Sequence, residues 1–287
     1  MKYSIKKNWG ASLKVIAEKP AIILPFIIIA FLQVLALEIL YFFPRWPLSA
    51  VAQPIVRKFF GEMYLHYPGS IFILPNLYYY FEVGIFIIFG VVLSAVSINI
   101  FKNVKTKVPL TPAALVKNAL KKYVSFVLYG ILLIGLTVLM ERGDRFLYAK
   151  VMRFAAQHFP NAVPKFYTLG LSLFLFVSSV IMQVFLVLTV PLIVLEKKSF
   201  FTALGRSIFL GFRHFFRILA LISLPFLVYL PIILIRTGLP VLANKTFPEI
   251  VVVVSVVSIL IAMLLDCFLV LCASQFLWDT EKESLLK

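Results

Sequence analysis

The sequence predicts an all-α fold, a polytopic membrane helical bundle of about six spans. Of its 287 residues, 62% are hydrophobic and only 14% are charged, with a mean hydropathy of +1.02. A typical soluble domain is about 45–50% apolar and about 25% charged. A water-soluble globule of this length has no interior large enough for so much apolar surface. Soluble-enzyme, disordered and collagen-like classes are therefore excluded.

The apolar residues fall into six runs, and a spanning helix needs about 20 largely apolar residues. The runs are residues 21–43, 78–100, 123–140, 169–195, 218–235 and 250–276. The first run is too long for the apolar core of a cleaved signal peptide, and no small-x-small cleavage site follows it. We therefore expect it to be retained as a span. The third and fifth runs are the shortest, so their ends are the least defined.

The distribution of basic residues predicts the orientation. Residues 1–20, 101–122, 196–217 and the tail after 276 carry 18 of the 28 lysines and arginines. Basic residues collect in cytoplasmic loops. We therefore expect both termini in the cytoplasm and the chain in the bacterial cytoplasmic (inner) membrane. Aromatic residues typical of headgroup level flank several runs: Tyr41, Phe42, Phe43, Trp46, Tyr78, Tyr79, Tyr80 and Trp278.

The net charge of +16 indicates that the binding partner is negatively charged. On a soluble chain it would suggest nucleic acid, but no recognition motif accompanies it here. In a membrane protein, basic segments contact anionic headgroups. We expect membrane lipids, chiefly anionic, as partners, with a membrane-protein partner as a further possibility, and no nucleic acid.

Each basic segment before a span pair has the pattern of an amphipathic helix lying at the membrane interface. The first carries an apolar stripe of Trp9, Leu13 and Ile16. The second begins at Thr111-Pro112, a capping hydroxyl followed by proline, and the third begins at Ser199. The predicted apolar faces are Leu115, Ala119 and Tyr123 in the second and Phe200, Leu204, Ile208, Phe212 and Phe215 in the third. The candidate lipid-facing basic residues are Lys117, Lys121, Lys122, Arg213 and Arg217.

This recurrence predicts a single integral membrane domain, residues 1–287, built from three units of an amphipathic helix and a helical hairpin. The units are about residues 1–100, 101–195 and 196–287. A chain that merely obeys the charge rule would look somewhat similar. On the opposite side, residues 48–67 and 143–159 are expected to form helices on the outer interface, or alternatively a lid over the bundle.

Polar side chains within the spans are candidates for a functional site, because such groups are costly in hydrocarbon. Asp266 lies about 17 residues into the sixth run, and Gln33 and Gln183 lie near the middle of the first and fourth. With Ser94, Ser97, Ser178 and Ser179, these three residues could form a polar patch. It would be either a substrate or proton site, or a set of hydrogen bonds between helices. Glu38 and Glu82 are expected near span ends, reaching headgroup water or pairing with Arg45, Arg57 or Lys58.

Enzyme signatures are missing from the sequence. It contains no G-x-S-x-G, H-E-x-x-H, Walker or C-x-x-C motif. Cys267 and Cys272 are five residues apart, on different faces of a helix, and form neither a disulfide framework nor a metal site. We therefore expect no catalytic residues, no metal site and no cofactor.

The stretch 191–213, PLIVLEKKSFFTALGRSIFLGFR, is the most distinctive part of the chain. It resembles a pattern in six-span bacterial membrane proteins related to the membrane domain of glycerophosphoryl diester phosphodiesterases. That pattern maps to Pro191, Glu196, Ala203, Leu204, Arg206, Ser207 and Gly211. The N-terminal WGASLKVIAEKPAIILP is similar to the start of such proteins. We expect no soluble phosphodiesterase domain, because eleven residues follow the sixth run, so the resemblance does not imply catalysis.

Glu196 and Arg206 form a candidate structural pair. Glu196 is the only acidic residue in segment 196–217, and Arg206 follows ten residues later. A turn between the span and the following helix would let the two side chains meet. Such an ion pair would fix the angle of that helix on the membrane.

Two functions remain open from the sequence. The first is a non-enzymatic scaffold or accessory subunit, in envelope or lipid homeostasis, that holds anionic lipid or a partner through its basic interfacial helices. The alternative is a small transporter or permease subunit with Asp266, Gln183 and Gln33 along a polar path at the midplane. An intramembrane lipid enzyme is a third class, disfavoured because no nucleophile and base are evident.

Overall fold

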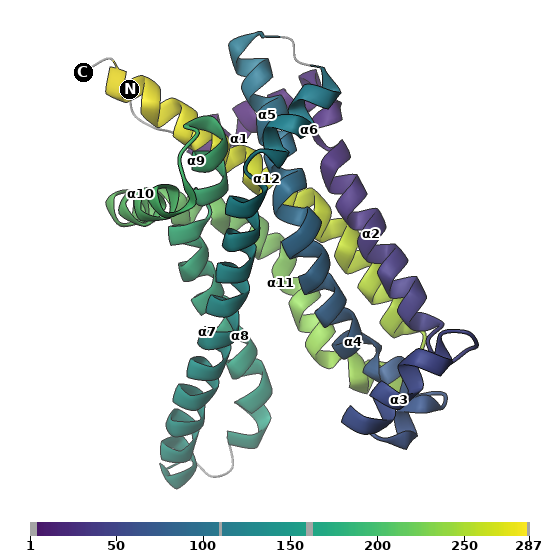
Figure 1. Ribbon diagram of the computed structural model, residues 1–287. Helices are drawn as coiled ribbons and strands as arrows, with labels where there is room; N and C mark the ends of the chain where they lie inside the picture. Colours follow the sequence, from purple (N-terminus) through teal and green to yellow (C-terminus); the bar gives the residue numbers. More distant parts are fainter. Residues whose placement is uncertain (1–4, 109–110, 159–162, 286–287) are drawn as a thin grey trace.

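The computed structural model describes residues 5–108, 111–158 and 163–285, and helices are the regular secondary structure found in these ranges. Six helical segments there are long and apolar enough to cross a membrane. They are Pro20–Tyr41, Gly69–Thr106, Tyr123–Phe154, Leu173–Leu195, Phe215–Arg236 and Ile250–Thr280. The predicted all-α polytopic bundle is confirmed (Figure 1).

The bounds of the elements follow the chain order. The α-helices are α1 (Ile5–Glu18), α2 (Leu24–Tyr41), α3 (Ser49–Phe59), α4 (Gly69–Ile85), α5 (Val91–Thr106), α6 (Pro112–Leu120), α7 (Tyr123–His158), α8 (Val163–Leu186), α9 (Thr189–Leu195), α10 (Phe200–Arg213), α11 (Phe215–Lys245) and α12 (Ile250–Leu285). Shorter turns are η1 (Pro20–Ile22), η2 (Glu62–Leu65) and the π-turn η3 (Phe86–Gly90). Through η3, α4 and α5 form one continuous helical segment.

Two predicted boundaries are wrong. The second span begins at Gly69, nine residues before the predicted start, because the helix passes through Pro75 instead of beginning after it. Residues 143–158 are not a separate interfacial helix but the second half of α7, and residue 159 lies outside the described residues. The charges after Met140 end the apolar run, but α7 contains no proline, so its backbone hydrogen bonding continues through them.

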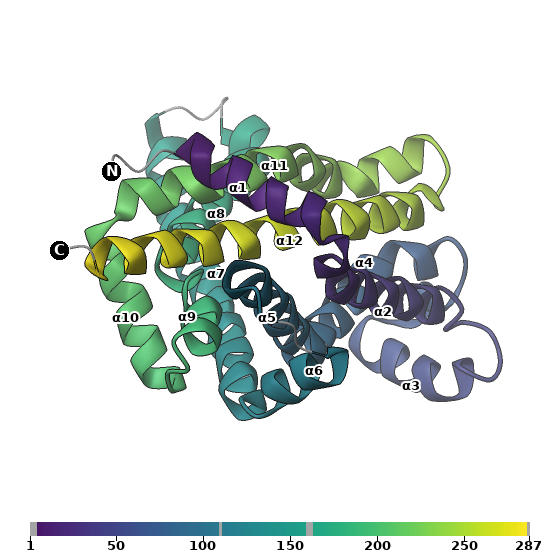
Figure 2. The same ribbon diagram turned by 90° about the horizontal axis from the view of Figure 1, so that it is seen from above.

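The two ends of the bundle differ. One end, called here the terminal end, holds α1, α6, α10 and the C-terminal part of α12 (Figures 1 and 2). The opposite end, called the α3 end, holds α3 and the lower parts of α7 and α8 (Figure 1). The element order repeats an amphipathic helix before a span pair at α1, α6 and α10. The unit boundaries near residues 100 and 195, and the side that faces the cytoplasm, stay predictions.

The main hydrophobic core lies toward the terminal end. Its largest fully buried side chains include Phe101, Phe126, Leu188 and Phe276, from α5, α7, the α8–α9 connection and α12. Smaller buried clusters toward the α3 end join α2, α3, α4, α11 and α12. Within the described residues, no side chain of α7 or α8 belongs to these smaller clusters. The bundle is therefore tightly packed at one end and divided at the other.

Helix α1 packs on the bundle through a mixed polar and apolar face. Asn8, Ser12 and Val15 are buried, Trp9 and Ile16 of the predicted stripe pack against the main core, and Leu13 of that stripe is 56% exposed. The amide of Asn8 donates to the Cys272 carbonyl of α12 at 3.4 Å. Leu13 can remain exposed because an apolar side chain of an interfacial helix faces lipid at no cost.

Helix α6 follows the prediction more closely. The Thr111 hydroxyl accepts a hydrogen bond from the Ala114 N–H at 3.3 Å, which confirms the predicted cap. Leu115 and Ala119 of the predicted apolar face are buried against the bundle. Tyr123 belongs to the start of α7 and is exposed.

Helix α10 packs on the bundle through small residues together with part of the predicted stripe. It buries Phe200 of that stripe and Ala203, Ser207 and Gly211, whereas Ile208 and Phe212 of the stripe are exposed. The Ser207 hydroxyl donates to the Phe185 carbonyl of α8 at 2.6 Å. Small residues allow the backbones of α10 and α8 to approach closely, which is the usual basis of helix packing in membranes. Ser199 occupies the N-cap position, but its hydroxyl bonds to the Thr202 hydroxyl instead of a backbone N–H.

We predict that Gly211→Ala destabilises the bundle, because the added Cβ would lie 2.8 Å from Cδ1 of Phe185 and 3.2 Å from the Val184 carbonyl oxygen. Overpacking of this kind lowers the free energy of unfolding by about 1–3 kcal/mol. Gly205→Ala on the same helix is the matched control, since its Cβ would meet nothing within 4 Å. Thermal unfolding in detergent measures both. Equal midpoints for the two variants would contradict the close packing of α10 on α8.

Candidate functional site

A cavity of about 310 Å³ lies between the spans, and it brings together the three predicted polar residues. Gln33 comes from α2, Gln183 from α8 and Asp266 from α12, and all three line this space. Glu82 of α4 and Ser94 of α5 line it too. We call this space the central cavity. Residues from distant parts of the sequence meet here because each lies within a different span of one bundle.

Asp266 faces the central cavity and not the packed core. Its side chain is exposed, although it lies well within α12 and helices α2, α4, α5 and α8 also contribute to the wall. The charged group that interacts with it is Glu82, which has the same sign. Within the described residues, no cation pairs with Asp266. The cavity therefore contains an acidic side chain without a cationic partner among the described residues.

Glu82 is placed differently from the prediction. Because α4 starts at Gly69, Glu82 lies inside a long helical segment and lines the cavity instead of reaching headgroup water. Its cationic neighbour is Arg236 of α11, not one of the basic residues near α3. Of those, Arg57 pairs with Glu62 at 3.1 Å. The pairing expected for Glu82 is therefore wrong.

Arg236 and Tyr229 of α11 complete the polar group around Glu82. The Arg236 guanidinium donates to the Tyr229 hydroxyl at 3.4 Å. Tyr229 also interacts electrostatically with Glu82 and Asp266. Neither residue was predicted from the sequence as part of a site, and Arg236 follows the last residue of the predicted fifth span. Their spacing of seven, two helical turns, would have placed them on one face of a long helix.

The side chains of Gln33, Gln183 and Asp266 are not joined to other helices by hydrogen bonds within the described part of the chain. Their contacts therefore do not support the hypothesis that these side chains stabilise the bundle through hydrogen bonds between helices. Ser97 does have that role, because its hydroxyl donates to the Ile22 carbonyl at 2.9 Å.

A second cavity lies next to the central one, toward the α3 end. It is about 590 Å³ in volume, and its lining comes from α4, α7, α8 and the residue after α3. Tyr79 lines both cavities, and Ser179 lines the second. Ser178 lines neither. The predicted polar patch is thus divided between two adjoining spaces and the packed core.

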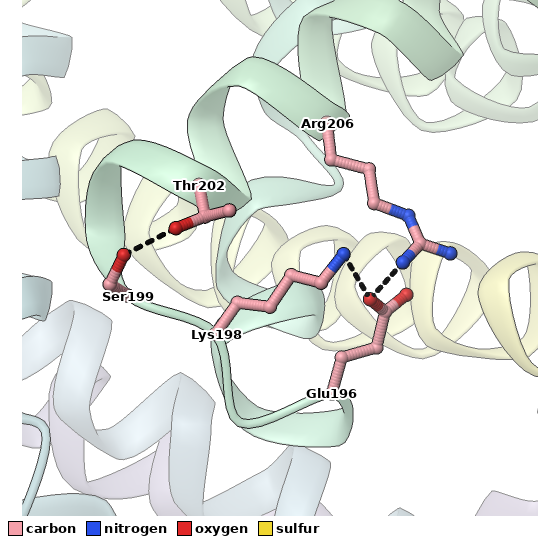
Figure 3. A network of polar contacts seen from close by, with 5 residues as sticks. All are labelled: Glu196, Lys198, Ser199, Thr202 and Arg206. Atoms are coloured by element: carbon pink, nitrogen blue, oxygen red, sulfur yellow. Dashed lines mark hydrogen bonds and ion pairs between the residues drawn. The ribbon is translucent and has the colours of Figure 1, made fainter.

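The candidate structural pair Glu196–Arg206 is in direct contact. Glu196 follows α9, its side chain is only 8% exposed, and its Oε2 accepts from the Arg206 guanidinium of α10 (Figure 3). Lys198 Nζ contacts the same oxygen at 2.9 Å. These charge-assisted contacts tie the middle of α10 to the end of α9 across the 196–199 turn.

Two lysines from outside α9 and α10 donate hydrogen bonds to the backbone at this turn. Lys102 Nζ of α5 donates to the Leu195 carbonyl at 3.1 Å. Lys122 Nζ, between α6 and α7, donates to the Lys197 carbonyl at 3.5 Å. The turn is therefore held from α5, from the α6–α7 connection and from α10.

The five candidate lipid-facing residues occupy α6, its connection to α7, α10 and the start of α11. Lys117, Lys121, Arg213 and Arg217 are exposed. Lys122 is half-buried and belongs to the contacts of the 196–199 turn. Lys122 is thus partly engaged within the protein, and the role of the others toward lipid stays a prediction.

We predict that Glu196→Gln lowers the free energy of unfolding by about 1.5–3 kcal/mol, the range for hydrogen bonds to charged groups. The substitution removes the negative charge that holds Arg206 and Lys198. Glu18→Gln is the control, because Glu18 is half-exposed and its contact with Lys14 is 3.8 Å long. Exposed pairs of this kind contribute about 0–1 kcal/mol. Thermal unfolding in detergent compares the two; a loss no larger than that of the control would argue against a stabilising role.

Comparison with known protein families, curated proteins and solved structures finds no match to this chain. The resemblance to the phosphodiesterase-related membrane family therefore stays a prediction. Within the described residues, no group of three His, Cys, Asp or Glu side chains is placed to hold a metal ion. What the structure supports is an integral membrane protein with six candidate spans and a polar cavity among them.

Proposed function

We propose that this membrane protein is a small transporter or permease subunit that admits a solute to the central cavity. The observation that carries the proposal is the position of Asp266, Gln183 and Gln33 around one space, with the Asp266 carboxylate exposed to it. Ionisable groups within spans mark substrate and ion pathways because they are costly elsewhere. Their arrangement favours this function over the scaffold function, which gives the cavity no role.

The two cavities support a direction of access. Tyr79 lines both the central cavity and the second cavity, which extends toward the α3 end. Toward the terminal end, buried residues such as Phe126 and Leu188 fill the bundle. A solute would therefore enter from the α3 end in this conformation.

The proposed location is the bacterial cytoplasmic membrane, with both termini in the cytoplasm. The excess of lysine and arginine in segments 1–20, 101–122 and 196–217 supports it. The helices of these segments share the terminal end (Figure 2). With this orientation, the central cavity would be accessible from outside the cell. No catalytic step is proposed.

A specific observation favours the scaffold or accessory function as a second candidate. Helix α10 and the start of α11 expose the large aromatic side chains of Phe201, Phe209, Phe212 and Phe216. The exposed Arg213 and Arg217 lie in the same stretch. Aromatic and basic residues together suit binding to an anionic membrane surface. This surface could hold lipid or a membrane-protein partner.

Cysteine labelling tests whether solutes reach the central cavity. In a background with Cys267 and Cys272 replaced by alanine, single cysteines replace Ser94 or Gln183, which line the cavity. The matched control is Ser97→Cys on the same helix as Ser94, because Ser97 is fully buried outside the cavity. We expect a membrane-impermeant thiosulfonate, added on the α3 side of oriented vesicles, to label positions 94 and 183 but not 97.

Labelling is read as a mass shift of the purified chain. A reactive cysteine at 94 and 183 requires water to enter the bundle, since thiosulfonates react with the ionised thiol. If both positions stay unlabelled in vesicles yet react after denaturation, the cavity is closed to water. That result would reject the transport proposal and leave the scaffold function.

A further inference from the structure

We infer that the central cavity selects an organic monocation, with its charged head at Asp266 and its apolar body among the aromatic side chains of the wall. The inference rests on the proposed function of this cavity. It adds the chemical class of the solute, which neither the six spans nor the cavity alone defines.

The charges around the cavity determine the sign of the ligand. Among the described residues that line it, Glu82 and Asp266 are the charged ones. Glu82 has Arg236 as a cationic neighbour, whereas Asp266 interacts with Glu82, a group of the same sign. Of the two acidic side chains, Asp266 therefore has no cationic neighbour among the described residues. A carboxylate away from bulk water is costly unless it is paired, so a single positive charge fits this cavity better than a neutral or anionic group.

The remainder of the wall determines the character of the cation. Phe26, Phe86, Tyr79 and Tyr129 contribute aromatic rings to a lining that is otherwise mainly aliphatic. Aromatic faces attract alkylammonium groups, and small-molecule sites are mostly apolar with a few polar groups that orient the ligand. The volume of about 310 Å³ lies at the lower end of the range of about 300–1,000 Å³ for such sites.

A divalent metal ion fits the same wall less well. Calcium takes about six to eight oxygen ligands, and magnesium demands an octahedral set. Within the described residues, no group of three His, Cys, Asp or Glu side chains could hold a metal ion. Two carboxylates at the edge of an aromatic wall instead match a bulky ammonium, which needs charge and apolar contact but few direct ligands.

The amides supply the remaining polarity. Gln33 and Gln183 line the cavity from α2 and α8, and their side chains are not hydrogen-bonded within the described residues. Each is free to accept from an ammonium N–H or to donate to a hydroxyl of the ligand. The second cavity shares Tyr79 with the central one, and its lining combines Tyr80, Met140 and Met182 with the polar Asn76, Thr137 and Ser179, which suits the passage of an amphiphilic cation.

The first experiment measures the affinity of the purified full chain in detergent for two probes of similar shape. Benzyltrimethylammonium carries a tetrahedral cationic head, and benzylsulfonate carries a tetrahedral anionic head of comparable size. We expect the cation to bind at least tenfold more tightly, measured by isothermal titration calorimetry. Equal affinities, or no binding of the cation at millimolar concentration, would overturn the inference.

The second experiment assigns the binding to Asp266. Asp266→Asn keeps the shape of the side chain and removes its charge, so we expect affinity for benzyltrimethylammonium to fall at least tenfold. Glu38→Gln is the control, since Glu38 is exposed on α2 and does not line the cavity; it should bind as the wild type does. If Asp266→Asn binds the cation within twofold of wild type, Asp266 is not the anchor and the inference fails.

A variant that fills the cavity covers the case in which Asp266→Asn does not fold. Met263 also lines the central cavity, and Met263→Trp should reduce cation affinity at least tenfold by occupying its space; unchanged affinity would place the cation elsewhere. The labelling experiment separates the two proposals. Labelled positions 94 and 183 without cation binding would retain a solute pathway and reject only the organic cation.

Discussion

Hydrocarbon as the surrounding solvent is the constraint on which the rest of this structure depends. Lipid tails are as apolar as leucine, so an apolar side chain gains little by turning inward, whereas a polar one must find a partner or a wet cavity. Small and polar residues accordingly occupy the contacts between helices, among them Asn8, Ser97 and Ser207. Large aromatic residues such as Phe212 and Phe216 remain on the outside. Helix packing and the location of the cavity both follow from this constraint.

The same constraint explains which sequence predictions succeed. The six spans were predictable because length and apolarity alone define them. The meeting of Gln33, Gln183 and Asp266 was predictable as a polar patch, because such groups avoid lipid. The side chains that α1 and α10 bury were not predicted, since their apolar stripes were assigned to the membrane interface and not to the contact with the bundle. Leu13 and Phe212 of these stripes are exposed, whereas Phe200 is buried.

The other errors come from helix ends. An apolar run shows where hydrocarbon can surround a helix, but a helix ends where its backbone hydrogen bonds end. Glu82 was assigned to a span end because the predicted span began at Tyr78, while α4 begins at Gly69. Arg236 follows the predicted fifth span but lies within α11. Of the two residues that interact near the cavity, hydropathy thus placed Glu82 close to a span end and Arg236 just beyond one.

The 196–199 turn lies at the tightly packed end of the bundle, and this packing constrains the proposed transport. Glu196, Arg206 and Lys198 hold α10 against α9 at the end where the main core is packed. A transporter must expose its site to each side in turn, and the access proposed for this conformation is toward the α3 end. Transport would therefore require the packing around Phe126 and Leu188 to open. The π-turn η3 lies in the cavity wall between α4 and α5, where the helix departs from α geometry, and such turns inside helices are frequent at functional sites.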